Sequence, residues 1–94
     1  MATIQYFDGH DGRVITLGDD DILIGQHRDC EIRFKNATVE RHHARIFREA
    51  GRYWIENLGS ESGVWIAGAR ITRRALAHRD RITCGRLVLE YFEH

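Results

Sequence analysis

Short runs of apolar residues recur along the chain, and turn-forming residues separate them. The runs are rich in β-branched and aromatic side chains, and several alternate apolar with polar positions as half-buried strands do. Glycine-containing pairs such as Asp11-Gly12, Ala50-Gly51 and Ala67-Gly68 lie between runs. Turn signals at roughly ten-residue spacing favour a sandwich or barrel over alternating strands and helices. We therefore expect strands at residues 12–17, 21–24, 31–34, 44–48, 53–56, 64–66, 81–84 and 87–92.

The rest of the chain adds little regular structure to this pattern. Only Thr72 to His78 has the composition of a helical turn, and we interpret it as a loop. No internal repeat, low-complexity tract or linker interrupts the sequence. A chain of 94 residues is long enough for one hydrophobic core and too short for two. We expect residues 1–94 to form a single domain, either as a whole protein or as a part cut from a longer one.

Composition and charge narrow the classes of partner. Hydrophobic residues make up 43% and charged residues 30% of the chain, as in ordinary soluble globular domains. Fourteen basic and fourteen acidic side chains are interspersed and give a formal net charge of zero. A general electrostatic attraction to nucleic acid or to an anionic membrane is therefore not expected. No apolar run approaches the length of a membrane span, so we expect no membrane insertion.

The cysteines and the N-terminal residues favour a cytoplasmic location. Cys30 and Cys84 are the only cysteines, and two such distant residues do not form a disulfide framework. The first residues, Met1 to Tyr6, lack the basic and apolar regions of a signal peptide. A reducing compartment therefore suits this sequence best.

Three segments carry a family resemblance: Ile24-Gly25-Gln26, Val39-Glu40-Arg41-His42-His43 and Leu58-Gly59-Ser60-Glu61-Ser62-Gly63. Their order and spacing resemble the forkhead-associated (FHA) domain, whose pattern is Gly-Arg, then Ser-x-x-His, then Asn-Gly. Gly25, His43 and Gly63 match the framework positions. The resemblance covers about residues 15 to 89. It implies an all-β, FHA-like sandwich of two antiparallel or mixed sheets with about ten to eleven short strands, in which loops at one end read phosphothreonine peptides.

The chain departs from the family at the three polar positions of the motif. Gln26, Glu40 and Ser62 replace the arginine, the serine and the asparagine. Arginine grips phosphate through a charge-assisted fork, whereas glutamine donates only a neutral hydrogen bond. Glu40 donates none when ionised, and two like charges about 4 Å apart repel by roughly 4 kcal/mol at an effective dielectric constant of 20. Serine is also shorter than asparagine, so the anchor for the peptide backbone is weakened.

The resemblance therefore implies a protein-interaction module whose phosphothreonine recognition is lost or altered. It would bind a protein, a peptide or copies of itself, as docking or assembly domains do in bacterial signalling and secretion. The alternative is a working phosphopeptide reader in which Arg41 and Arg28 hold the phosphate. The residues expected on the binding loops are Gln26, Arg28, Lys35, Asn36, Glu40, Arg41, Ser60 and Ser62.

Metal and thiol chemistry are the remaining alternatives. His27, Cys30, His42 and His43 supply zinc donor types, but adjacent residues of an extended chain point to opposite faces, which opposes joint chelation by His42 and His43. A cysteine–histidine nucleophile would use Cys30 or Cys84, although a cysteine inside a strand usually serves as a small buried hydrophobe. We expect no catalytic residue, no metal and no cofactor, and His43 is expected to brace the loops as in the family.

Overall fold

A computed structural model describes residues 1–94, which form eleven strands and no helix. A six-stranded sheet has the order β2-β1-β11-β10-β7-β8, and a five-stranded sheet has the order β4-β3-β5-β6-β9. Every strand pair is antiparallel except β3 with β4. The bounds are β1 Ala2–Phe7, β2 Gly12–Leu17, β3 Ile22–Gly25, β4 Ile32–Arg33, β5 Ala44–Glu49, β6 Arg52–Asn57, β7 Val64–Ile66, β8 Ala69–Ile71, β9 Arg73–Ala75, β10 Arg81–Cys84 and β11 Leu87–Glu93.

The predicted all-β sandwich with two sheets is confirmed, and so are all eight predicted strands. Three strands were not predicted: β1, β8 and β9. The interpretation of Thr72 to His78 as a loop is wrong in part, because Arg73–Ala75 pairs with β6 as β9. That strand lies at a sheet edge, where pairing with one neighbour suffices and no apolar alternation is required.

The core lies between the two sheets, where each strand turns alternate side chains inward. Leu87, Leu89 and Tyr91 of β11 are at most 1% exposed, whereas Val88 between them is 41% exposed. Ile46 of β5 and Ile55 of β6 are equally buried in the facing sheet. Full burial of such a side chain contributes about 1.5–3 kcal/mol. This two-sided apolar layer gives the loops at the sheet ends a fixed base.

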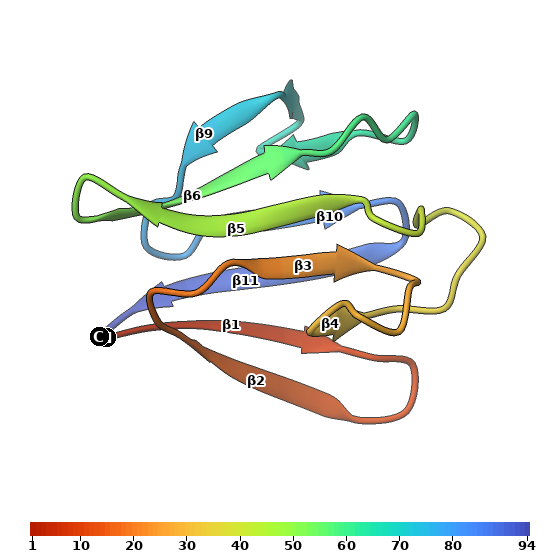
Figure 1. Ribbon diagram of the computed structural model, residues 1–94, viewed down its shortest axis with the longest axis horizontal. Coiled ribbons are helices and arrows are strands. Elements are labelled where there is room, and N and C mark those ends of the chain that lie inside the picture. The colour runs from red at the N-terminus through yellow and green to blue at the C-terminus, as the bar shows by residue number, and fades with distance from the viewer.

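Three connections meet at one end of the sandwich. In Figure 1, β3 and β6 run towards the end opposite the two chain termini, and β5 starts from that same end. The β3–β4, β4–β5 and β6–β7 connections therefore gather there, and the two termini lie together at the other end. The structure contains no helix long and apolar enough to cross a membrane.

Candidate functional site

Backbone hydrogen bonds join the three gathered loops, which we call the site loops: residues 26–31, 34–43 and 58–63. The Gln26 N–H donates to the Glu40 carbonyl at 2.9 Å, and the His27 N–H donates to the Arg41 carbonyl at 3.1 Å. The Leu58 N–H donates to the His43 carbonyl at 3.0 Å. Because main-chain groups make these bonds, the loops hold their relative positions whatever side chains they present.

Gly25 allows the first two site loops to approach closely. A Cβ atom at this position would lie 2.1 Å from the Arg41 carbonyl oxygen and 2.8 Å from the Glu40 carbonyl oxygen. Both obstacles are backbone atoms, which cannot swing aside. The glycine is buried and is required by the packing of two backbones.

His43 braces the same region from within the core. It is fully buried, its Nδ1 accepts the Glu40 N–H at 3.2 Å, and its Nε2 lies 2.8 Å from the Gly63 carbonyl oxygen. A carbonyl can only accept, so Nε2 carries the proton and the ring is the neutral Nε2–H tautomer. Gly63 itself has a φ of +77°, which an L side chain rarely adopts. Both motif residues thus join the site loops to one another.

Gln26 is directed inward, towards the second site loop. Its Nε2 donates to the carbonyl oxygens of Asn36 and Val39, each at 2.7 Å. Both amide protons are therefore engaged within the protein. Asn36 in turn uses its Oδ1 to accept from the N–H and the hydroxyl of Thr38, at 2.9 and 2.6 Å. Gln26 stands where the family has an arginine, and in this chain its side chain closes the turn that follows β4.

Glu40 connects the second site loop to the third. Its Oε2 accepts the backbone N–H of Glu61 at 2.8 Å. Glu40 is exposed and makes no ion pair, not even with the adjacent Arg41. The carboxylate stands where the family has serine, and it takes up a donor within the protein.

Ser62 completes the connection between the loops. Its hydroxyl donates to the Thr38 carbonyl at 2.9 Å, and the Thr38 hydroxyl accepts the Arg86 N–H at 2.8 Å. Nothing in the sequence singled out Thr38, whose role depends on the loop geometry alone. All three replaced positions of the motif therefore use their side-chain polar groups in intramolecular hydrogen bonds.

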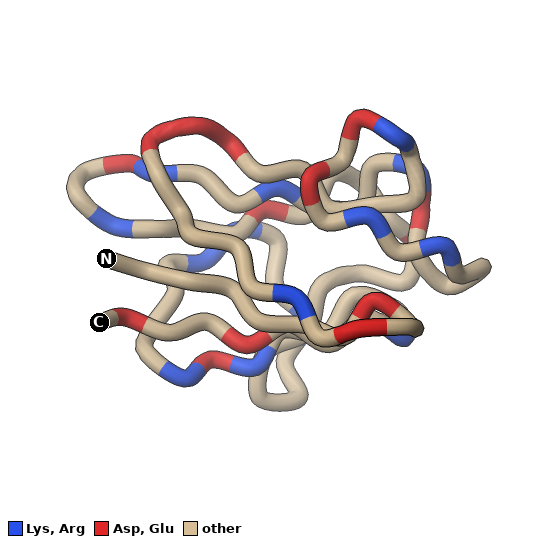
Figure 2. Tube along the Cα trace, turned by 90° about the horizontal axis from the view of Figure 1, so that it is seen from below, with Lys and Arg blue, Asp and Glu red and all other residues tan.

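The remaining residues expected on the loops divide into two groups. Ser60 is only 3% exposed, and its hydroxyl donates to Asn57 Oδ1 at 2.5 Å, so it stabilises the β6–β7 turn from inside. Arg28, Lys35 and Arg41 are exposed and form no ion pair. The tube in Figure 2 shows acidic and basic residues interspersed at this end. The side chains of these three cations are available to a partner.

The histidines form a cluster different from the one that the sequence suggests. His27 Nδ1 lies 2.7 Å and His42 Nε2 lies 3.0 Å from Asp29 Oδ1. The hydrogen bond with His42 is the main cause that lowers the pKa of Asp29. Of the four residues weighed for zinc, His43 is turned away to the Gly63 carbonyl. Cys30 is buried, and its Sγ lies 3.4 Å from the Arg41 carbonyl oxygen and 3.7 Å from Asp29 Oδ1. Asp29 was missed because its role depends on a turn that brings it back over His27.

Both cysteine thiols are protonated at neutral pH. Burial raises the pKa of Cys30 to about 11, with the nearby Asp29 charge as a smaller cause, and burial raises the pKa of Cys84 to about 12. The Cys30 Sγ lies 3.4 Å from the Arg41 carbonyl oxygen, to which it donates. A thiolate nucleophile is therefore disfavoured at either position.

Known proteins resemble the chain in sequence and in fold. The FHA domain sequence model matches residues 22–85. The FHA domain-containing protein FhaB of Mycolicibacterium smegmatis is 31% identical over 61 residues, which cover 65% of this chain and 39% of FhaB. The chain thus spans about two fifths of the length of this curated relative.

Solved FHA domains superpose on nearly the whole sandwich. One, from work on phosphothreonine-dependent FHA domain interactions, has a TM-score of 0.89 and 27% identity, covering 99% of this chain and 96% of its own. The FHA domain of FhaA, solved in complex with the intracellular domain of another protein, has a TM-score of 0.87 and 26% identity, covering 97% of this chain and 99% of its own. From its fold, its framework residues and these matches, the chain belongs to the FHA domain family.

Proposed function

We propose that this chain is a protein-interaction domain whose site loops bind a partner without requiring phosphothreonine. The observation that carries the proposal is the hydrogen bond from the Glu61 N–H to Glu40 Oε2 at 2.8 Å. A carboxylate in this place repels a phosphate and already occupies a backbone donor of the facing loop. Gln26 and Ser62 are likewise engaged within the protein.

The loops nevertheless keep the features of a docking surface. Main-chain bonds and His43 hold them on a rigid sandwich, which is a common arrangement for binding sites. Arg28, Lys35 and Arg41 are exposed and unpaired, so an acidic protein surface can pair with them. The guanidinium groups of Arg28 and Arg41 suit bidentate contact with carboxylates. A partner with carboxylates that reach past Glu40 therefore fits this end better than a dianionic phosphate does.

The proposed setting is bacterial signalling or assembly, and the relatives support the docking of proteins. FhaB is a mycobacterial FHA domain protein, and the FhaA domain was solved with the intracellular domain of another protein. By this analogy the chain docks proteins, either a different partner or another copy of itself, and performs no catalysis. Both thiols are buried and have a raised pKa, which agrees with a binding role.

A repair experiment tests the proposal. The variant Gln26→Arg/Glu40→Ser/Ser62→Asn restores the family residues, and peptides with phosphothreonine or plain threonine are titrated against it and against the wild-type chain. We expect phosphate-dependent binding in the repaired protein and none in the wild type. Micromolar binding by the wild type that requires the phosphate would overturn the proposal.

A second candidate is favoured by one observation: Arg41 and Arg28 have no acidic partner within the protein. If they hold a phosphate, Arg41→Ala abolishes phosphate-dependent binding and Glu40→Ser strengthens it. Arg81→Ala is the matched control, because Arg81 is also exposed and unpaired but starts β10 at the other end of the sheet. This candidate fails if Arg41→Ala and Arg81→Ala bind phosphopeptides alike.

A further inference from the structure

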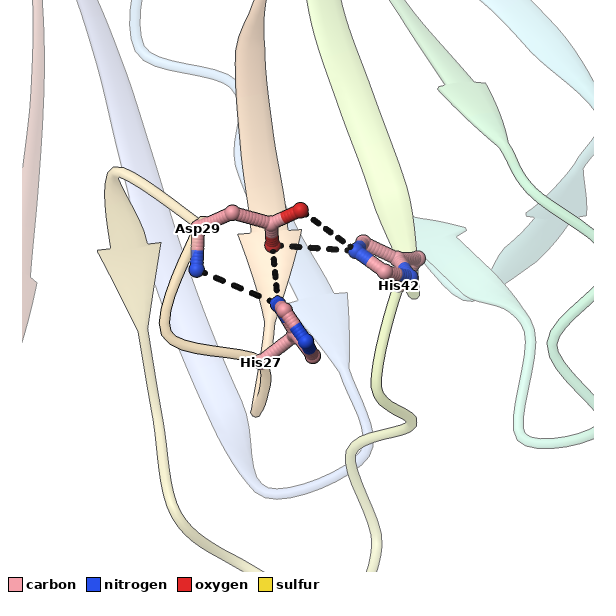
Figure 3. A group of neighbouring side chains, drawn as sticks. All are labelled: His27, Asp29 and His42. Atoms are coloured by element: carbon pink, nitrogen blue, oxygen red, sulfur yellow. Dashed lines mark hydrogen bonds and ion pairs between the residues drawn. The ribbon is translucent and has the colours of Figure 1, made fainter.

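His27, Asp29 and His42 converge at the ends of two strands, and none of them stands at a position that the family motif specifies. His27 and Asp29 lie in the loop after β3, and His42 lies just before β5. In Figure 3 the Asp29 carboxylate sits between the two imidazoles, and all three side chains point towards one another. The ring centroids are 5.0 Å apart. Two residues of one loop and one residue of another thus meet at a single point.

The backbone holds this arrangement in place. The His27 N–H donates to the Arg41 carbonyl at 3.1 Å, which fixes the two loops beside each other. The Cys30 N–H donates to the His27 carbonyl at 3.0 Å and closes the turn that carries Asp29. The path of the chain therefore brings the backbones of the three residues together, and their side chains meet from there.

His27 Nδ1 and Asp29 Oδ1 lie close enough to share a proton or a metal cation. The backbone N–H of Asp29 points at this nitrogen from 3.2 Å, as it would towards a lone pair. The Asp29 Oδ1 lies 2.7 Å from the same nitrogen. A nitrogen that accepts one hydrogen bond with its single lone pair cannot also donate to a carboxylate. Two lone pairs this close repel unless a proton or a metal cation lies between them.

We propose that His27, Asp29 and His42 bind one divalent transition-metal ion, of which Zn²⁺ is the representative. Two imidazole nitrogens and a carboxylate suit zinc and its neighbours in the first transition row, whereas calcium and magnesium prefer oxygen ligands alone. His27 would bind through Nδ1 and His42 through Nε2, with a carboxylate oxygen of Asp29 as the third ligand. Water takes the fourth position, because the cluster faces solvent.

The distances allow this ligation with small side-chain movements. All donor atoms lie within 4.8 Å of one another. Zinc bonds of about 2.0–2.2 Å place tetrahedral ligands roughly 3.3 Å apart, so the widest gap must close by up to about 1.5 Å. The side chains of Asp29 and His42 are 50% and 41% exposed, and they can rotate without disturbing the core. The Cys30 thiol lies behind Asp29, 3.7 Å from its Oδ1, and is buried and protonated, so it is not among the proposed ligands.

Zinc binding is tested on the whole chain after it has been treated with a chelator and the chelator has been removed. Zinc chloride is titrated at pH 7.5 by calorimetry, while the imidazole resonances are followed by NMR. We expect one ion per chain with micromolar affinity and shifts confined to His27 and His42. His27→Gln, Asp29→Asn and His42→Gln should each weaken affinity at least about 10-fold, since even residues behind the ligands are worth about 10- to 100-fold. His10→Gln is the control, because His10 is exposed and its ring forms no hydrogen bond.

Two results would overturn the site. One is zinc binding that persists in the double variant His27→Gln/His42→Gln, which would place the ion elsewhere. The other is a wild-type chain whose His27 and His42 signals move with pH but not with millimolar zinc, which would show that a proton alone bridges the cluster. Since the NMR readout uses the unmodified chain, it decides the question even if a variant folds poorly. Neither result bears on whether the site loops bind phosphothreonine.

Discussion

Replacing Gly25 with alanine should destabilise the domain where the first two site loops meet. The new Cβ would lie 2.1 Å from the Arg41 carbonyl oxygen, and since carbon and oxygen rarely approach much within 3.2 Å, the Glu40–Arg41 backbone must retreat by roughly 1 Å. That retreat stretches the bonds from the Gln26 and His27 N–H groups, now 2.9 and 3.1 Å long, beyond hydrogen-bonding distance.

The expected cost follows from two contributions. Overpacking a close contact costs about 1–3 kcal/mol, and each lost hydrogen bond costs about 0.5–1.5 kcal/mol. We expect Gly25→Ala to lower the free energy of unfolding by about 3 kcal/mol. For a domain of this size that corresponds to a fall in Tm of about 12–24 °C.

Chemical denaturation followed by tryptophan fluorescence measures this cost. Gly18→Ala is the matched control, because Gly18 is exposed and an added Cβ there would meet no atom within 4 Å. Its free energy of unfolding should change by less than about 0.5 kcal/mol. If the two alanine variants are equally stable, the close approach of the two loop backbones is not what this glycine provides.

Three further predictions concern stability and reactivity. His43→Ala should lower the free energy of unfolding by about 2–4 kcal/mol, because it leaves a cavity and two buried backbone groups without partners; denaturation measures it, and a change below about 1 kcal/mol refutes the bracing role. The Asp11 N–H, the Arg13 side chain and the His10 N–H hold the pKa of Asp8 well below its usual range. Its stabilisation is complete above about pH 4 and is lost as the pH falls, so Asp8→Asn should flatten the decline in Tm between about pH 4 and pH 2; an unchanged slope contradicts this. Cys30, with its raised pKa, should react with iodoacetamide at pH 8 far more slowly in the folded than in the unfolded chain, as mass spectrometry can show; equal rates would refute its burial.

Strand positions could be predicted where burial repeats with the period of a sheet. β11 is an example, since its alternation of Leu87, Leu89 and Tyr91 with exposed residues is visible in the sequence. β9 could not be predicted, because Arg73 and Arg74 carry no such alternation. Its pairing depends on β6, whose paired residues lie 17 to 21 positions earlier in the chain and are not reported by local patterns.

The sequence predicts which residues belong to the candidate site, but it does not predict their hydrogen-bond partners. The motif spacing predicts that Gln26, Glu40 and Ser62 lie near one another, and the structure places them on adjoining loops. Their partners are the Asn36, Val39 and Thr38 carbonyls and the Glu61 N–H, all of them backbone groups. Every residue has such groups, so no sequence pattern reveals which ones will be reached.

The central claim is that the wild-type site loops do not require phosphate for binding. Its most direct test is an NMR titration of the wild-type chain with a phosphothreonine peptide and with its unphosphorylated twin, followed at the amides of Gln26, Glu40 and Arg41. We predict that the two peptides shift these amides equally or not at all. Saturating shifts at micromolar concentration with the phosphopeptide alone would contradict the claim.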